Sequence, residues 1–302
     1  MNILHFIKRF ALPFSMLIGG ALYPFAKWVN PLTPALIFAM LLLTFSKMKL
    51  SDLKIKPVHY WLIAIQVIAS LLLYGIIRPF NETIAQGILI CVMVSPATAS
   101  PVITGMLGGS VSTLTTYILL CNVVVSLYAP LLFSFMGMGK ELPFHLSFLN
   151  IFEQIGTLLL LPLLASWAIR RFIPVVHQKI VSISQLSFFL WAFALAIVTG
   201  MTVSFLIEHG ISNILLEIGL FAASMVICLL HFVVGRKIGR KYGDPVSGGQ
   251  ALGQKNTILA IWMAQSYMNP LASVAPAAYV LWQNVVNSYQ LYLREKGKAL
   301  PF

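Results

Sequence analysis

The chain has 302 residues, of which 59% are hydrophobic and only 9% are charged. A soluble globular domain carries roughly 25% charged residues, so this composition excludes one and indicates a polytopic α-helical membrane protein. The formal net charge of +12 lies in short loops between long apolar runs, and no basic face with interleaved aromatic residues predicts a nucleic-acid partner.

Long apolar runs predict ten membrane spans. Each run holds about the 20 mostly apolar residues that a span needs, apart from a shorter second run. In chain order, the predicted spans are 10–29, 31–46, 58–78, 84–108, 111–136, 151–172, 183–207, 212–235, 246–268 and 271–293.

The basic residues of the loops predict how the chain is oriented. Sixteen Lys and Arg residues fall on the side of the N-terminus and three on the opposite side, and Lys255 lies within a span. Because basic loops are retained in the cytoplasm, we expect both termini to be cytoplasmic. The chain would then be a multi-pass protein of the inner (plasma) membrane of the cell.

The ten spans divide evenly into two sets of five. Each set has an odd number of helices, so the second set would be inverted relative to the first. The fourth span of each set is interrupted by helix-breaking residues. Paired broken helices in two inverted halves point to the binding site of a transporter. The sequence therefore predicts an all-α polytopic fold with two inverted five-helix repeats.

The first interruption covers residues 95–101. Pro96 and Pro101 lack amide donors and prevent a continuous hydrogen-bond ladder. A proline-kinked helix that only packs against its neighbours is the alternative interpretation. The hydroxyls available to the freed backbone groups are those of Thr98, Ser100 and Thr104.

The second interruption covers residues 248–257. Gly248, Gly249 and Gly253 are expected to loosen the backbone there. Half-helix N-termini at the two interruptions would carry partial positive charge, which favours a bound anion. The polar side chains of this stretch, apart from its lysine, are Gln250, Gln254, Asn256 and Thr257.

Lys255 is predicted to lie near mid-membrane. A charge buried in hydrocarbon is costly, so an intramembrane ionisable residue is a functional-site hypothesis by default. All eight Asp and Glu residues fall in loops or near span ends, so no carboxylate partner is predicted. Two possibilities stay open: Lys255 releases its proton during transport, or it stays charged by bonding carbonyls, hydroxyls and a substrate anion.

The tenth span carries a row of amides. Gln283, Asn287 and Gln290 fall on one helical face, with Asn284 and Ser288 beside it. We interpret this row as a polar wall towards the binding site, and hydrogen bonding between helices is the alternative.

The other polar residues of the spans predict packing rather than chemistry. Asn122 and Ser126 form a smaller polar pair on the fifth span, for which hydrogen bonding between helices is the expected role. The histidines lack metal-ligand spacing, and the three cysteines lie in apolar runs. Paired acids, a Ser-His pair or a metal cluster within the spans are not visible. We therefore expect neither an enzyme nor a cofactor.

At these motifs the chain resembles the bile acid:sodium symporter family. Members carry a Pro and then a stretch such as Thr-Ala-Ser-Asn in the fourth span, where residues 95–101 read Ser-Pro-Ala-Thr-Ala-Ser-Pro. Their ninth span carries Glu-x-Gly-x-Gln-Asn, where residues 250–256 read Gln-Ala-Leu-Gly-Gln-Lys-Asn. Their Trp-His-Asn of the last span is similar to Trp282-Gln283-Asn284, and a Pro late in their fifth span matches Pro130.

The resemblance implies one transmembrane transporter unit, residues 1–302. Its panel domain would hold spans 1, 2, 6 and 7, and its core domain spans 3–5 and 8–10, with broken helices 4 and 9 crossing in the core. Substrate would bind between panel and core, and their relative motion would give alternating access. Typical substrates of the family are organic anions such as bile acids, pyruvate and pantoate-like acids.

The chain departs from the family at its sodium sites, first in the ninth span. The Glu of the family motif falls on Gln250, which removes a carboxylate. Its Gln falls on Gln254 or Lys255, and matching Gly253 and Asn256 to the family's Gly and Asn places it on Lys255.

Further departures lie in the fourth and fifth spans. The Asn of the fourth-span motif becomes Pro101, and the hydroxyl ligands of the fifth span fall on Leu114 and Ile118. Hard-cation sites need several oxygen donors, often including a carboxylate. Here a carboxylate is lost and a cation is gained. We therefore predict that Lys255 acts as a tethered cation in place of sodium.

Together these features predict a secondary active transporter of small organic anions, sodium-independent and coupled to protons or to no ion. Proton coupling would then depend on Lys255. One alternative is a sodium-coupled, bile-acid-like symporter that uses backbone carbonyls and Gln250. Another is a cation:proton antiporter, which would need buried acids. The candidate substrate- or ion-binding residues are Lys255, Gln250, Gln254, Asn256, Thr257, Thr98, Ser100, Thr104, Gln283, Asn284 and Asn287.

Overall fold

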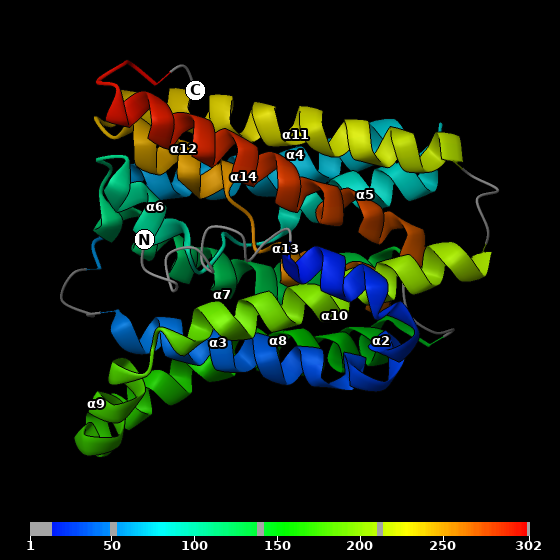
Figure 1. Cartoon of the computed structure of the whole chain (residues 1–302), viewed down its shortest axis with the longest axis horizontal. Coiled ribbons are helices and arrows are strands. Elements are labelled where there is room, and N and C mark those ends of the chain that lie inside the picture. The colour runs from blue at the N-terminus through cyan, green and yellow to red at the C-terminus, as the bar shows by residue number, and fades with distance from the viewer. Residues whose placement is uncertain (1–13, 49–52, 138–141, 210–213, 301–302) are drawn as a thin grey trace. The chain divides into compact units, whose positions relative to one another are not determined.

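The regular structure of the chain is helical. A computed structural model describes residues 14–48, 53–137, 142–209 and 214–300. These ranges contain helices, turns and one isolated antiparallel β-bridge, which joins Pro96 and Lys255, and they contain no strand (Figure 1).

The chain divides into two compact units, and each combines segments from both halves of the sequence. Unit 1 consists of Met1–Lys47 and Thr157–Ile214, and unit 2 consists of Met48–Gly156 and Leu215–Phe302. The boundary between them falls within one helix, α8. A unit built from distant segments requires long-range packing rather than local helix propensity alone.

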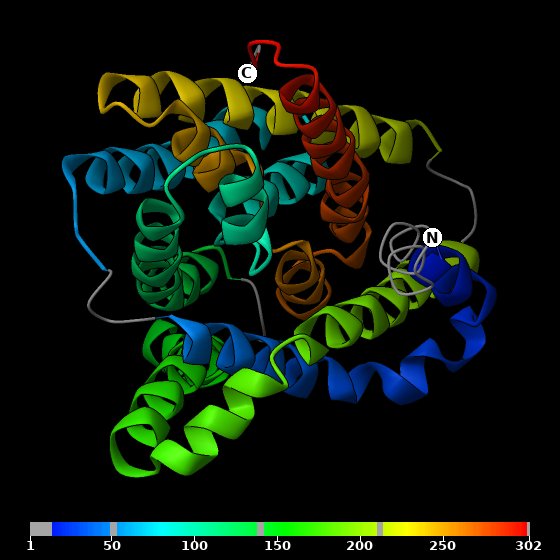
Figure 2. The ribbon, with the colours of Figure 1, turned by 60° about the vertical axis from the view of Figure 1, so that its left-hand side comes forward.

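Unit 1 is built around α10, which lies along α2 and α3 (Figures 1 and 2). Residues 14–21 are also helical, and a Cβ on Gly19 would overlap the carbonyl oxygen of Ala196 on α10. Glycine is therefore needed for this close backbone approach. The elements of unit 1 are α2 (Tyr23–Val29), the 3-10 helix η1 (Asn30–Leu32), α3 (Thr33–Lys47), the end of α8 (Phe144–Phe172), α9 (Pro174–Ser182) and α10 (Leu186–His209).

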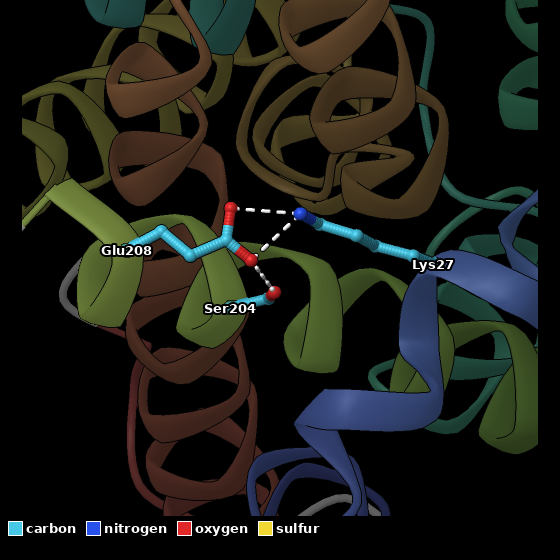
Figure 3. Close-up of polar contacts among 3 residues, drawn as sticks. All are labelled: Lys27, Ser204 and Glu208. Carbon is cyan, nitrogen blue, oxygen red and sulfur yellow. Dashed lines mark hydrogen bonds and ion pairs between the residues drawn. The ribbon is translucent and has the colours of Figure 1, made fainter.

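An ion pair links two of these helices at their ends. The Lys27 ammonium on α2 lies 2.6 and 2.7 Å from the two carboxylate oxygens of Glu208 on α10. The Ser204 hydroxyl donates to the same carboxylate at 2.9 Å (Figure 3). Both charged side chains are about half exposed. An exposed pair of this kind contributes at most about 1 kcal/mol to stability.

Unit 2 contains the two interrupted helices. Every residue of α5 from 85 to 93 is buried, so this helix lies inside the unit rather than on its surface. The elements of unit 2 are α4 (Pro57–Ile77), α5 (Glu82–Met93), α6 (Ser100–Met106), α7 (Val111–Phe135), the start of α8, α11 (Ile214–Lys241), α12 (Pro245–Gly253), α13 (Thr257–Tyr267), the 3-10 helix η3 (Pro270–Ser273) and α14 (Val274–Glu295).

The glycines of the second interruption have a different role from the expected one. Gly248 and Gly249 lie inside α12, and a Cβ on Gly248 would overlap the carbonyl oxygen of Gly235 on α11. Gly253, the last residue of α12, lies against the ring of Phe232. For Gly248 and Gly249 the prediction of a loosened helix is wrong, because α12 continues through both, and Gly248 allows α12 to pack closely on α11.

Six helices in the described part of the chain are long and apolar enough to cross a membrane. Together with the absence of strands there, they are consistent with a helical membrane protein. The fourth and ninth predicted spans each consist of two short helices, and α14 overlaps the tenth. The count of ten spans and the inverted repeat stay predictions. The six are Tyr23–Lys47, Pro57–Ile77, Val111–Phe135, Phe144–Phe172, Leu186–Phe205 and Ile214–Lys241.

Candidate functional site

The two interruptions lie against each other and are hydrogen-bonded through their backbones. We call residues 94–99, between α5 and α6, the first break, and residues 254–256, between α12 and α13, the second break (Figure 1). The amide of Ala97 donates to the carbonyl of Gln254 at 3.0 Å, and the amide of Asn256 donates to the carbonyl of Ser95 at 2.9 Å. Two broken helices thus satisfy part of each other's freed backbone.

Local sequence explains where the helices stop and restart. At the first break, Pro96 cannot donate to a helical carbonyl, and Pro101 lies in the first turn of α6, where its missing amide hydrogen costs nothing. At the second break, Gln254 has extended backbone angles, and the side chain of Asn256 accepts from the amide of Leu259 and caps α13. These caps satisfy donors that a helix start would otherwise leave unpaired.

Lys255 is buried in unit 2, with 1% of its surface exposed. Its ammonium donates to three oxygens: the Gln66 side chain at 3.2 Å, the carbonyl of Val92 at 2.9 Å and the carbonyl of Val94 at 3.0 Å. We call these three oxygens the oxygen cage. An ammonium has three N–H donors and no acceptor, so the cage matches its full hydrogen-bonding capacity.

The cage is the C-terminal end of α5 together with one side chain of α4. The carbonyls of Val92 and Val94 are among the last of α5. Such carbonyls have no partner within the helix and carry partial negative charge. The positive charge of Lys255 compensates that end of α5. The backbone amide of Lys255 also donates to the Gln283 side-chain oxygen at 2.8 Å, so α14 helps to hold the residue in place.

Gln66 is the site residue that the sequence did not predict. Its side-chain nitrogen donates to the Met93 carbonyl at 2.6 Å, and its oxygen accepts from the Tyr117 hydroxyl at 2.6 Å as well as from Lys255. These partners fix which end of the amide faces the ammonium. A signal was present, because Gln66 is an amide in the middle of the apolar run that forms α4.

The amide side chains of α14 bond two different parts of the second interruption: the side chain of Gln250 and the backbone of Lys255. Asn287 and Gln290 accept hydrogen bonds from the Gln250 side-chain nitrogen at 2.9 and 3.0 Å, and Gln283 accepts from the Lys255 backbone. These contacts are the hydrogen bonds between helices that the alternative interpretation expects. Whether the row also contacts substrate stays a prediction. Asn284 is only half-buried and donates to its own helix, at the Val280 carbonyl.

The remaining predicted residues lie around the first break. The Ser100 hydroxyl donates to the carbonyl of Ala97 at 2.6 Å, and Thr98 is half-buried. The Ser95 hydroxyl donates to the Asn122 side chain at 3.1 Å. Asn122, for which we expected hydrogen bonding between spans, therefore supports the break through such a bond.

Several buried oxygens have no hydrogen-bond partner among the described residues. They include the side-chain oxygens of Thr104, Gln250 and Gln254, all of which are predicted site residues. Thr257 is buried at the start of α13. Buried polar groups without partners are rare in folded proteins, and a ligand, an ion or ordered water is the usual explanation.

The charge of Lys255 has no carboxylate beside it in the described part of the chain. The ion pairs found there are Lys27 with Glu208 and Arg78 with Glu82. In the same ranges, no group of three or more His, Cys, Asp and Glu residues is placed to hold a metal ion. A charged Lys255 would therefore be surrounded by neutral dipoles, without a counter-ion among these residues. Neither a protein-family model nor a curated protein matches the chain.

Proposed function

We propose that this chain is a secondary active transporter of small organic anions that works without sodium, because the Lys255 ammonium takes the place of a coupling cation. The observation that carries the proposal is the oxygen cage around the Lys255 Nζ. Hard cations in proteins are held by carbonyl and amide oxygens of this type. Here a tethered ammonium fills that position permanently.

The charge at the breaks supports an anionic substrate. A protonated Lys255 brings a full positive charge to the breaks, since the oxygens that bond it are neutral. Charges interact strongly in surroundings of low dielectric constant, so an anion close to the breaks gains Coulomb energy even without touching the ammonium. The N-terminus of α13, directly after Lys255, adds partial positive charge.

The division into two units supports transport by alternating access. Unit 2 contains both breaks and all the residues that bond Lys255, so the site belongs to one compact body. Unit 1 covers most of the residues of the proposed panel domain, and unit 2 covers most of those of the proposed core domain. In this proposal the core moves relative to the panel and carries the bound anion across the inner membrane.

A sodium-coupled symporter is the second candidate function. It is favoured by the buried side-chain oxygens of Thr104, Gln250 and Gln254, which lack partners among the described residues. Oxygens of this kind would serve as ligands of a hard cation. In that case Lys255 would hold the two breaks together, and sodium would bind at a separate place.

Transport by purified protein in liposomes separates the two candidates. We would measure exchange of labelled pyruvate, pantoate and cholate, the carboxylates that the resemblance indicates, in sodium and in choline buffer. The proposal predicts exchange of at least one carboxylate at equal rates in both buffers. It also predicts a loss of at least tenfold in Lys255→Gln.

Lys27→Gln is the matched control for that variant. It removes an exposed ammonium from unit 1 and should keep the wild-type rate. Exchange that requires sodium would favour the second candidate. Exchange of none of the carboxylates, by protein that remains folded and monodisperse, would argue against both transport functions.

A further inference from the structure

A hydrogen-bonded relay reaches the second break from α11. His231 on α11 and Tyr279 on α14 are both buried, and the His231 Nδ1 lies 3.0 Å from the Tyr279 hydroxyl. The Tyr279 hydroxyl donates to the carbonyl of Gly253 at 2.9 Å. Gly253 ends α12, directly before the second break.

The relay fixes which nitrogen of His231 carries the proton. Tyr279 has one hydroxyl hydrogen, and a carbonyl oxygen can only accept, so this hydrogen points to Gly253. The His231 Nδ1 must therefore donate to the Tyr279 oxygen. The Nε2 of His231 has no hydrogen-bond partner among the described residues, so its lone pair is available for a second proton.

Lys255 is poorly suited to carry the proton. A neutral amine has two N–H donors and a lone pair, so loss of the proton would turn that lone pair towards one of the three oxygens of the cage. One buried oxygen would then lose its donor and face a second acceptor. Buried unpaired groups are costly, so the cage favours a lysine that stays charged.

His59 provides a contrast within unit 2. Its Nδ1 accepts from the backbone amide of Lys56 at 3.0 Å, and its Nε2 lies 3.0 Å from the carbonyl of Thr113. Both ring nitrogens are therefore occupied by the backbone. Protonation of His59 would break the bond to Lys56, whereas protonation of His231 adds a proton and keeps the bond to Tyr279.

We propose that His231 is the residue that binds and releases a transported proton, which makes the carrier an anion–proton symporter. This inference rests on the proposed function. The proton enters at Nε2 from one side of the membrane and leaves from the same atom to the other. One carboxylate and one proton then cross together, and no net charge is moved.

The charge of Lys255 couples the binding of a proton at His231 to the binding of the substrate anion. Near His231 lie the Tyr279 hydroxyl on α14 and the Lys255 ammonium, and the thiols of Cys228 on α11 and Cys91 on α5 lie near Tyr279. A second positive charge on His231 is repelled by Lys255, and a bound anion offsets that repulsion. By reciprocity, a proton on His231 strengthens anion binding by the same factor.

The test combines proton flux with anion exchange in the same liposomes. The lumen is loaded with the pH dye pyranine, and pyruvate, pantoate or cholate is added outside; protein-free liposomes report passive entry of the acid. In the wild type, lumen acidification should accompany uptake, and exchange should be faster at pH 5 than at pH 7. In His231→Gln, carrier-dependent acidification should fall at least tenfold, and the pH dependence of exchange should disappear.

His59→Gln is the matched control, because it removes the other buried histidine of unit 2. It should retain acidification and the pH dependence of exchange. A second measurement needs no substrate: ¹⁵N NMR of histidine-labelled protein should show an Nδ1–H tautomer that is absent from His231→Gln. In Tyr279→Phe, which keeps His231 but removes its acceptor, this tautomer should be lost.

The possible failures are distinguishable. Acidification that persists in His231→Gln, or an Nε2–H tautomer of His231 in the wild type, would overturn the inference and leave the carrier function standing. Absence of exchange in the wild type would overturn the proposed function, and the inference with it.

Discussion

The two breaks of unit 2 differ in what they contribute to the site. The first break and the end of α5 present oxygens: the carbonyls of Val92 and Val94 accept from Lys255, and the carbonyl of Ser95 accepts from Asn256. The second break presents hydrogens, mainly the Lys255 ammonium and the Asn256 amide. The backbone of the first break also donates once, from the amide of Ala97 to the carbonyl of Gln254, so the difference lies mainly in the side chain of Lys255 and the carbonyls that bind it.

This difference shows what an interrupted helix requires inside a membrane protein. The last carbonyls of a helix have no internal partner, and hydrocarbon offers them none. A bound cation or a side chain has to satisfy them. In this chain Lys255 reaches them from the opposite break, so charge compensation is part of the covalent structure rather than a result of ion binding.

Gln66→Leu tests the oxygens that accept from Lys255, and we expect it to have the largest effect on stability. It removes an oxygen from the cage but leaves the Lys255 charge buried, and it also removes the partners of Tyr117 and of the Met93 carbonyl. A hydrogen bond to a charged group contributes about 1.5–3 kcal/mol, and with the unpaired Tyr117 hydroxyl we expect a total loss of about 3 kcal/mol. The free energy of unfolding, measured by SDS titration in mixed micelles, should fall by about that amount.

Gln66→Glu is the control for that substitution. It keeps the side chain's length and gives Lys255 a carboxylate, but it sets a carboxylate oxygen against the Met93 carbonyl, so stability should fall less than in Gln66→Leu without reaching that of the wild type. Anion exchange should fall at least tenfold, because the site loses its net positive charge. If Gln66→Leu and Gln66→Glu lowered the free energy of unfolding equally, Gln66 would not bond the ammonium.

Lys255→Met removes the ammonium that donates to these oxygens, and we expect a smaller effect on stability. The carbonyls of Val92 and Val94 lose a donor, but the buried charge and its desolvation cost disappear as well. Unpaired buried carbonyls cost roughly 1–3 kcal/mol each, and we expect a loss of about 2 kcal/mol by the same titration. Lys27→Met, at an exposed ion pair, should change stability by less than about 1 kcal/mol. An unchanged stability of Lys255→Met would contradict the cage.

Asn256→Ala compares the starts of the two helices that follow the breaks, α6 and α13, and should have the smallest effect on stability. Asn256 caps α13 through its side chain, whereas Ala99 begins α6 without a side-chain cap. Loss of such a cap costs about 1 kcal/mol, measured as the free energy of unfolding. The reverse change at the other break, Ala99→Asn, should be neutral or stabilising. A cost well above 2 kcal/mol for Asn256→Ala would indicate a further role for that side chain.

The sequence was most informative about the breaks, because their signals are local. Proline at positions 96 and 101 and a lysine in an apolar run predict an interruption without knowledge of the fold. The role of Gly248 and Gly249 was assigned wrongly, because a glycine that ends a helix and a glycine that lets two helices meet look alike in sequence.

The cage itself depends on partners that are distant in the chain. Gln66 and Lys255 are 189 residues apart, and the other two ligands of the ammonium are backbone carbonyls, which carry no sequence signal. The His231–Tyr279 contact joins α11 to α14 in the same way. Such contacts are set by tertiary packing, and composition and periodicity do not specify them.

The central claim is that the Lys255 ammonium occupies the place of a coupling cation. The most direct test is the thermal unfolding of purified protein in detergent, in sodium and in choline buffer, for the wild type and for Lys255→Ala. We expect sodium to leave the unfolding temperature of the wild type unchanged and to raise that of Lys255→Ala, in which the oxygen cage has lost its ammonium. Stabilisation of the wild type by sodium would show that a separate sodium site exists and would contradict the claim.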